Sequence, residues 1–239
     1  LENIKNFKII IIDNAGNSKL KSQVEKNFSI HKYILNKKNY GITKAINQAI
    51  KASNTEYILN INADCFIEEK DILILIKSHQ NYNNCFIAAP TFYDDNLRLS
   101  YNSDSFQEKN LDIEILNIEG NVCVDKVLCS AMLFKKQDII ELGLLDENFF
   151  LYFVDDDFCR MIKKINKSVV QIFDAKARHI HGKSKVKNVI KKTFLRNYHF
   201  TYDELYYYYK INKHDEKYGN LKKKIKSYLI KFIFNFIIL

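Results

Sequence analysis

The sequence has little proline and glycine and no tryptophan. One Pro and 6 Gly in 239 residues exclude collagen, proline-rich linkers and most low-complexity architectures. No apolar run reaches the roughly 18 residues of a membrane-spanning helix. By contrast, 17 Phe and 15 Tyr supply ample apolar surface for a packed core. The composition therefore predicts a folded globular chain of one or two domains.

Several diagnostic motifs are also missing. The 5 cysteines are odd in number and form no Cys-x-x-Cys, which favours buried, reduced thiols and leaves no visible zinc site. The phosphate-binding loop Gly-x-x-x-x-Gly-Lys-Ser/Thr, the dinucleotide fingerprint Gly-x-Gly-x-x-Gly and the Gly-x-Ser-x-Gly elbow do not occur. Neither a P-loop nucleotidase nor a dinucleotide-dependent oxidoreductase is supported.

Positive charge is concentrated near the C-terminus. Residues 183–239 contain 14 Lys or Arg and 4 Asp or Glu, a net charge of +10, whereas residues 1–182 carry −1. Residues 221–239 read as a basic amphipathic helix, with an apolar face opposite its lysines. Such a segment suits an anionic membrane or a nucleic acid. Alternatively, its apolar face packs on the body of the protein or continues into a longer spanning helix.

Short apolar runs alternate with amphipathic segments along the rest of the chain. Strands are expected at residues 7–12, 31–35, 57–61, 85–89, 127–134 and 169–173. Helices are expected at residues 18–27, with Ser18 as the cap, and at 41–52, 69–79, 137–142 and 155–165. This alternation predicts an α/β fold with a mixed, mostly parallel sheet covered by helices. Ligands bind beyond the carboxyl ends of strands in such sheets.

Two expected strand ends carry short polar strings. Asp13-Asn14 follows the first strand, and Asn62-Ala63-Asp64 follows the third. A lone carboxylate such as Asp64 is compatible with a turn or a helix cap. It is also compatible with a hard-cation site, because Mg²⁺ or Mn²⁺ on a diphosphate needs only one or two protein carboxylates. Both interpretations stay open on the residues alone.

The strongest motif is an aromatic run followed by three carboxylates, Phe149-Phe150-Leu151-Tyr152-Phe153-Val154-Asp155-Asp156-Asp157. One acidic residue would be enough to complement the dipole of the helix that begins here. Three adjacent carboxylates repel one another, and burial of one would raise its pKa, as a general base requires. The motif therefore indicates a candidate base.

Two histidines follow the last expected strand in Arg178-His179-Ile180-His181-Gly182-Lys183-Ser184. On an extended chain, His179 and His181 point the same way. Either could be a metal ligand, and a structural role is the alternative.

Taken in order, these strings resemble the family-2 glycosyltransferases of the GT-A fold, in their rhamnosyltransferase-like branch. The resemblance covers residues 7–184 and is carried by five stretches: Ile11–Ala15, Asn39–Asn47, Asn60–Asp64, Leu144–Asp157 and His179–Ser184. They are similar to the family's Val-Asp-Asn-Ala-Ser, Asn-x-Gly-x-x-x-Ala-x-Asn, Leu-Asn-Pro-Asp, Phe-Asp-Glu-x-Phe-Phe-x-Tyr-x-Glu-Asp-x-Asp and His-x-x-Gly-x-Ser patterns.

The resemblance implies an inverting transfer of rhamnose or a similar hexose. The donor would be a nucleotide-diphosphate sugar, and the acceptor a hydroxyl of a cell-surface glycan or a lipid-linked molecule. Asp155 would be the catalytic base, with Asp157 as the competing candidate. Asp64 and His179 would hold a divalent cation, Mg²⁺ or Mn²⁺. The residues implied in nucleotide-sugar binding are Asp13, Asn14, Gly41, Asn47 and Asn62.

The resemblance also implies a domain division and exposes departures from the family. Residues 1–184 would form the GT-A domain, with a strand and helix missing before residue 7, and residues 185–239 a basic helical extension. Val154 replaces a family Glu, and Cys129 stands where a small Gly is usual. A non-catalytic relic or a basic membrane-binding module are the alternatives. The expected location is cytoplasmic, peripheral on the inner face of the cell membrane, with no nucleic-acid partner.

Overall fold

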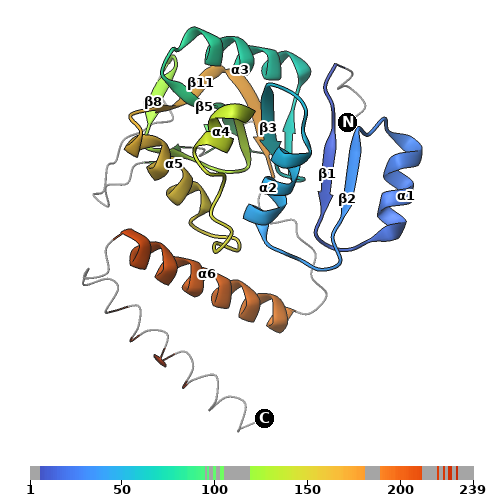
Figure 1. Cartoon of the computed structure of the whole chain (residues 1–239), viewed down its shortest axis with the longest axis vertical. Helices are drawn as coiled ribbons and strands as arrows, with labels where there is room; N and C mark the ends of the chain where they lie inside the picture. The colour runs from blue at the N-terminus through green and yellow to red at the C-terminus, as the bar shows by residue number, and fades with distance from the viewer. Residues whose placement is uncertain are drawn as a thin grey trace.

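A mixed β-sheet lies at the centre of the protein in this computed structural model, with helices on both of its faces (Figure 1). The structure describes residues 6–94, 96, 99–100, 103–104, 119–180, 189–211, 220, 223, 226–227 and 230. Within these residues the main sheet contains seven strands, and two further strand pairs stand apart from it. This arrangement confirms the predicted α/β class.

The main sheet has the strand order β3, β10, β5, β11 and β4, with β6 beside β5 and β8 beside β11. Its members are β3 (Tyr57–Ile61), β4 (Cys65–Ile67), β5 (Cys85–Tyr93), β6 (Leu99–Ser100), β8 (Val122–Val124), β10 (Ala131–Lys135) and β11 (Ser168–His179). The separate pairs are β1 (Ile10–Asp13) with β2 (Lys32–Leu35), and β7 (Ser103–Asp104) with β9 (Lys126–Val127). The helices are α1 (Ser18–Asn27), α2 (Ile42–Ala52), α3 (Glu69–Asn81), α4 (Lys136–Glu141), α5 (Val154–Lys164) and α6 (Val189–Ile211).

Antiparallel pairing prevails in the described part of the main sheet, contrary to the expectation of a mostly parallel one. The pair β5–β11 is parallel, whereas β10 runs antiparallel to both β3 and β5. Strand β10 is buried along almost its whole length. A strand covered on both faces is a continuous apolar run whatever the direction of its neighbours, so its sequence did not reveal its direction.

Each face of the main sheet packs against its own helices. Leu75 of α3 packs with Leu133 and Ile172 on one face. On the other face, Phe158 of α5 makes edge contacts with Phe86 and Phe134, and its cluster includes side chains of α2 and α4. Successive side chains of a strand point to opposite faces of the sheet, so alternate residues pack into two separate hydrophobic cores.

Several boundaries differ from the prediction. Helix α1 spans the predicted residues, but its cap is Asn17, whose side chain accepts a hydrogen bond from the Leu20 N–H at 3.1 Å, and not Ser18. The prediction of a single strand at 127–134 is wrong, because the chain turns between β9 and β10. In this turn the Cys129 carbonyl accepts a hydrogen bond from Asn60 Nδ2 at 2.5 Å.

The five cysteines are all free in the structure. Four are buried, as predicted, and Cys123 is exposed. Burial raises the pKa of Cys85 and Cys159 to about 12, so these thiols are protonated at neutral pH.

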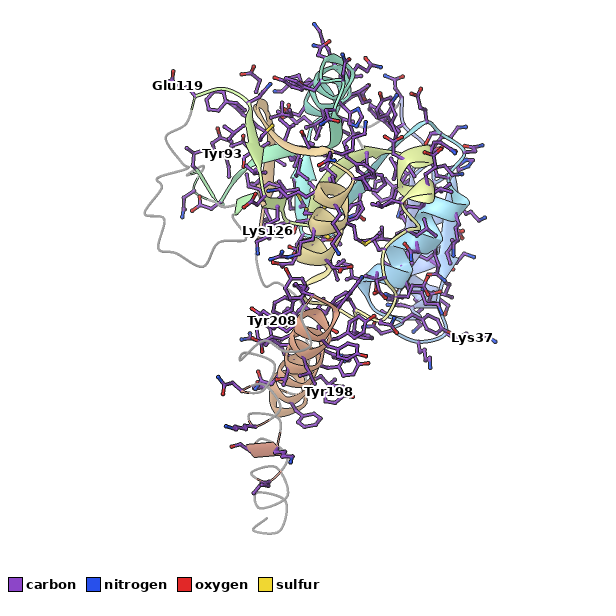
Figure 2. The ribbon with its side chains drawn as sticks, turned by 60° about the vertical axis from the view of Figure 1, so that its left-hand side comes forward. Lys37, Tyr93, Glu119, Lys126, Tyr198 and Tyr208 are labelled. Carbon is purple, nitrogen blue, oxygen red and sulfur yellow. The ribbon has the colours of Figure 1, made fainter. Side chains whose placement is uncertain are left out.

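Helix α6 lies beneath α5 and the loop that precedes it (Figure 1). Asp203 and Tyr207 on its inner face are 0% and 4% exposed. Tyr198, labelled in Figure 2, is 55% exposed. The helix therefore packs on the body along one face only. No helix among the described residues combines the length and the apolar character needed to cross a membrane.

Candidate active site

Asp64 and His179 are brought together by the pairing of two strands. Strand β4 runs antiparallel to β11, with Cys65 opposite His179. The Ile180 N–H donates to the Asp64 carbonyl at 2.9 Å, which extends the pairing past the ends of both strands. As a result, Asp64 Oδ1 lies 3.5 Å from His179 Nε2.

This pair suits a divalent cation bound to a diphosphate. Two neighbouring ligand atoms at about 2.1 Å from an octahedral ion lie roughly 3.0 Å apart, so the observed 3.5 Å requires only a small adjustment. The Asp64 side chain is 34% exposed, which leaves the pair open to a ligand. No third Asp, Glu, His or Cys joins them among the described residues, and phosphate oxygens and water commonly complete such sites. His181, the other candidate ligand, lies outside the described residues.

Asp13 orders the loop that follows β1. Its carboxylate accepts hydrogen bonds from the N–H groups of Ala15 at 2.7 Å and Asn17 at 3.3 Å, and from the Tyr33 hydroxyl at 2.9 Å. Burial and the bond to Asp13 raise the pKa of Tyr33 to about 12. Asp13 itself is only 7% exposed, so the loop is fixed before any ligand binds.

Asn14 links this loop to the start of α2. Its amide donates to the Gly41 carbonyl at 3.0 Å, and its side-chain oxygen accepts from Asn36 Nδ2 at 2.8 Å. Asn36 in turn exchanges hydrogen bonds with Gln48 of α2. Hydrogen bonds between the side-chain amides of Asn14, Asn36 and Gln48 therefore connect the ends of β1 and β2 to α2.

Gly41 allows the N-terminus of α2 to approach the aromatic loop, which we define as residues 149–153. Its φ is +88°, and a Cβ there would lie 2.7 Å from the Phe150 carbonyl oxygen. The next residue, Ile42, donates its N–H to that same oxygen at 2.8 Å. A side chain at Gly41 would therefore be strained and would push the two segments apart.

Asn47 connects α2 to the segment just before the aromatic loop. It is 2% exposed. Its amide donates to the Leu145 carbonyl at 2.9 Å and to the Glu147 carboxylate at 3.1 Å, and it accepts from the Leu145 N–H at 3.1 Å.

Asn62 donates its amide to Ser130 Oγ at 3.4 Å. The nucleotide-sugar roles of these residues stay predictions, and the contacts in the structure are internal.

The three adjacent carboxylates at the start of α5 have three different environments. Asp156 forms an ion pair at 2.7 Å with Lys126, which is labelled in Figure 2. Asp157 is 6% exposed and pairs with Lys210 of α6 at 2.8 Å. Burial still raises the pKa of Asp157, and Lys210 partly offsets this. Two of the three carboxylates are therefore paired with lysine side chains.

Asp155 has the environment of a base. Burial, reinforced by the charge of Asp156, raises its pKa to about 6. The charge of Lys126 and local backbone N–H groups act in the opposite direction but do not cancel this effect. A carboxylate with a pKa near 6 is largely ionised at pH 7 and still basic enough to take a proton.

The residues of α6 that contact this region were not predicted from the sequence. The Asp203 carboxylate accepts backbone hydrogen bonds from the aromatic loop, and Lys210 bridges Asp146 and Asp157. The available signal was Asp203, next to Glu204 among the aromatic residues of the predicted helical extension. It was too weak to indicate which segment Asp203 would contact.

The fold resembles a known glycosyltransferase structure. A solved structure described as GalNAc-T7 with UDP, GalNAc and Mn²⁺ superposes with a TM-score of 0.58 at 12% identity, covering 73% of this chain and 38% of that one. This likeness confirms the GT-A type of fold. The model of the family Glycosyl transferase family 2 matches residues 1–139. The chain belongs to this family.

Two curated relatives are similar over most of this chain. One is the low-salt glycan biosynthesis hexosyltransferase Agl10 of Haloferax volcanii, 26% identical over 193 residues, or 73% of this chain and 62% of the relative. The other is the dTDP-rhamnosyl transferase RfbF of Shigella flexneri, 27% identical over 188 residues, or 77% of this chain and 63% of the relative. The chain thus spans less than two thirds of either relative. The second supports the likeness to the rhamnosyltransferase-like branch.

Proposed function

We propose that this chain transfers a sugar from a nucleotide-diphosphate sugar to an acceptor hydroxyl with inversion at the anomeric carbon. The observation that carries the proposal is the difference in environment among the three carboxylates at the start of α5. Asp156 and Asp157 are paired with Lys126 and Lys210, whereas the pKa of Asp155 is raised to about 6. Asp155 is therefore proposed as the base and Asp157 as a structural residue.

In the proposed reaction, Asp155 takes the proton of the acceptor hydroxyl. The acceptor oxygen forms a bond to the anomeric carbon as the bond between that carbon and the diphosphate oxygen breaks. The bonding electron pair leaves with the nucleotide diphosphate, and direct displacement inverts the configuration. Asp64 and His179 would hold a Mg²⁺ or Mn²⁺ ion, which would supply positive charge to the leaving diphosphate.

The donor and acceptor classes are proposed from the relatives. The names of the two curated relatives refer to hexosyl and dTDP-rhamnosyl transfer, and one refers to glycan biosynthesis. Rhamnose or a similar hexose is therefore the proposed sugar, and a glycan or lipid-linked molecule the proposed acceptor. A non-catalytic relic is the alternative, favoured by Val154, which is 3% exposed where the family has a carboxylate.

A nucleotide-sugar panel tests the proposal. The chain is incubated with dTDP-rhamnose and with UDP-, GDP- and dTDP-hexoses in the presence of Mn²⁺ or Mg²⁺, and release of nucleotide diphosphate is measured. We expect slow hydrolysis of one donor class, because water replaces the acceptor. Binding of dTDP or UDP without hydrolysis of any donor, and without transfer to any added glycan, would favour the relic.

We further propose that residues 185–239 form an extension that attaches the enzyme peripherally to an anionic cytoplasmic membrane face. The predicted amphipathic face at 221–239 lies mostly outside the described residues. Support comes from the net +10 charge of residues 183–239 and from the exposed Tyr198 and Tyr202 of α6, which are 55% and 47% exposed.

Flotation with lipid vesicles checks the membrane proposal. We expect the full chain to float with vesicles containing anionic lipid, and less so at high salt, because each lysine near the surface contributes about 1 kcal/mol that salt screens. A variant lacking residues 221–239 should stay unbound. Equal binding to neutral vesicles, or binding to neither, would contradict the proposal.

A further inference from the structure

A fully buried carboxylate on α6 holds the backbone of the aromatic loop. Asp203 is 0% exposed. Its Oδ1 accepts the Phe150 N–H at 3.1 Å, and its Oδ2 accepts the N–H groups of Leu151 at 2.9 Å and Tyr152 at 2.8 Å. Burying a carboxylate is costly unless such bonds compensate it, so Asp203 and the loop depend on each other for their positions.

The opposite side of the same loop is held by the first turn of α2. The Thr43 hydroxyl donates to the Phe149 carbonyl, and the Ile42 N–H donates to the Phe150 carbonyl at 2.8 Å. The ring of His199 on α6 stacks on Phe150 at a centroid distance of 3.8 Å. Three N–H groups of the loop thus bond to α6 and two of its carbonyls bond to α2, so both edges of its backbone are held.

The aromatic loop leads directly into the helix that carries the candidate base. Its last residue, Phe153, adopts a left-handed φ of +59° and is the cap of α5, and Asp155 follows two residues later. No flexible linker separates the held backbone from that carboxylate. A shift of the loop would therefore displace the start of α5 and open it to water.

The structure assigns Asp203 as a positioning residue for Asp155, acting through the backbone of the aromatic loop. This inference rests on the proposed function of Asp155 as the base. It makes α6 part of the working active site, although α6 lies outside the region that the family model matches. The same helix adds Lys210, which bridges Asp146 at 2.9 Å and Asp157 at 2.8 Å on either side of the loop.

The charged and titratable groups around Asp155 contribute to its pKa, so they decide what a titration of Asp155 would measure. Asp156 of α5 and Lys126 of β9 act on it in opposite directions. Burial raises the pKa of the thiols of Cys129, in the turn before β10, and Cys159 of α5, and the charge of Asp155 adds to both shifts. None of these groups is moved directly by a change at Asp203. A changed titration of Asp155 would therefore report movement of the loop and the start of α5.

The test replaces Asp203 by Asn and follows the Asp155 carboxyl by NMR with labelled aspartate. The Asn side chain turns an NH₂ group toward backbone N–H donors and cannot accept all three bonds. We expect the midpoint of Asp155 to fall from about 6 by at least about 1 pH unit, toward the ordinary value near 3.9, because water enters. With any donor that the unaltered chain turns over, kcat should fall at least about 10-fold while the Kd for nucleotide stays within about 2-fold.

Two further variants make the result decisive. Asp174→Asn removes an exposed carboxylate of β11 and should leave the Asp155 midpoint unchanged. Thr43→Val releases the opposite edge of the loop and should lower the midpoint in the same direction as Asp203→Asn. If Asp203→Asn does not fold, Thr43→Val alone decides. An unchanged Asp155 midpoint in the folded variants would overturn the inference. The titration needs no donor, so absence of turnover by the unaltered chain would count against the proposed function separately.

Discussion

Replacing Asp155 by Asn should lower turnover at least about 100-fold while the fold and the affinity for nucleotide are kept. The amide has nearly the shape of the carboxylate but cannot take the proton of the acceptor hydroxyl, and a positioned base contributes roughly 10²–10⁴-fold. Steady-state kinetics with the donor found in the panel, together with calorimetric titration of nucleotide, measure both quantities.

Asp157→Asn is the matched control, because it removes a carboxylate two residues away on the same helix. Its loss should cost stability, since Lys210 loses one of its two partners, and should affect turnover less than the change at Asp155. Near-normal turnover of Asp155→Asn would rule out Asp155 as the base. A larger loss of turnover with Asp157→Asn would transfer the role to Asp157.

The pH dependence follows from the direction of the shift in Asp155. As the proposed base, Asp155 would act only when it is deprotonated, and its pKa is raised to about 6. Turnover should therefore be nearly constant above about pH 7 and fall about tenfold per unit well below pH 6. If turnover falls only near pH 4, Asp155 titrates as an ordinary exposed carboxylate.

Asp64→Ala should abolish metal-dependent nucleotide binding and lower turnover at least about 100-fold. The proposed site has only two protein ligands within the described residues, so losing one leaves the imidazole of His179 alone. Changes to outer-shell partners of metals already cost roughly 10–100-fold, and a direct ligand should cost at least as much. Calorimetry with dTDP and UDP, with and without Mn²⁺, measures the binding.

Removal of the metal and changes to the histidines complete this second test. Chelation should stop turnover, and Mn²⁺ or Mg²⁺ should restore it. His179→Ala should weaken nucleotide binding less than Asp64→Ala, because the carboxylate also supplies charge. Full turnover in chelator would reject the metal site. A stronger effect of His181→Ala than of His179→Ala would show that the wrong histidine was chosen.

Local patterns allowed most of the elements around the candidate site to be predicted from the sequence. Helix α1 and strand β3 occupy the predicted residues, because a turn-rich string before α1 and the apolar run of β3 are local signals, although the cap of α1 is Asn17 and not Ser18. The approach of Asp64 to His179 was reached only through the family resemblance. Its physical cause is the pairing of β4 with β11, and β4 was not predicted at all.

The remaining parts of the site depend on contacts between distant segments. Nothing near Asp203 in the sequence indicates that its carboxylate accepts N–H groups from a loop more than 50 residues earlier. Likewise, the family resemblance implied that Gly41 and Asn47 bind the donor, which stays a prediction, but it gave no sign that both contact the segment from Leu145 to Phe150. Periodicity describes one element at a time and carries no information on such pairings.

The bonds that hold the aromatic loop also bear on how this protein folds. Thr43 lies 106 residues before its partner Phe149, and Asp203 lies 53 residues after Phe150. Closing such long segments costs entropy that is recovered only when both contacts exist. The region around Asp155 is therefore completed only when both contacts have formed. During synthesis on the ribosome, the surroundings of the proposed base can be completed only after α6 has left the exit tunnel.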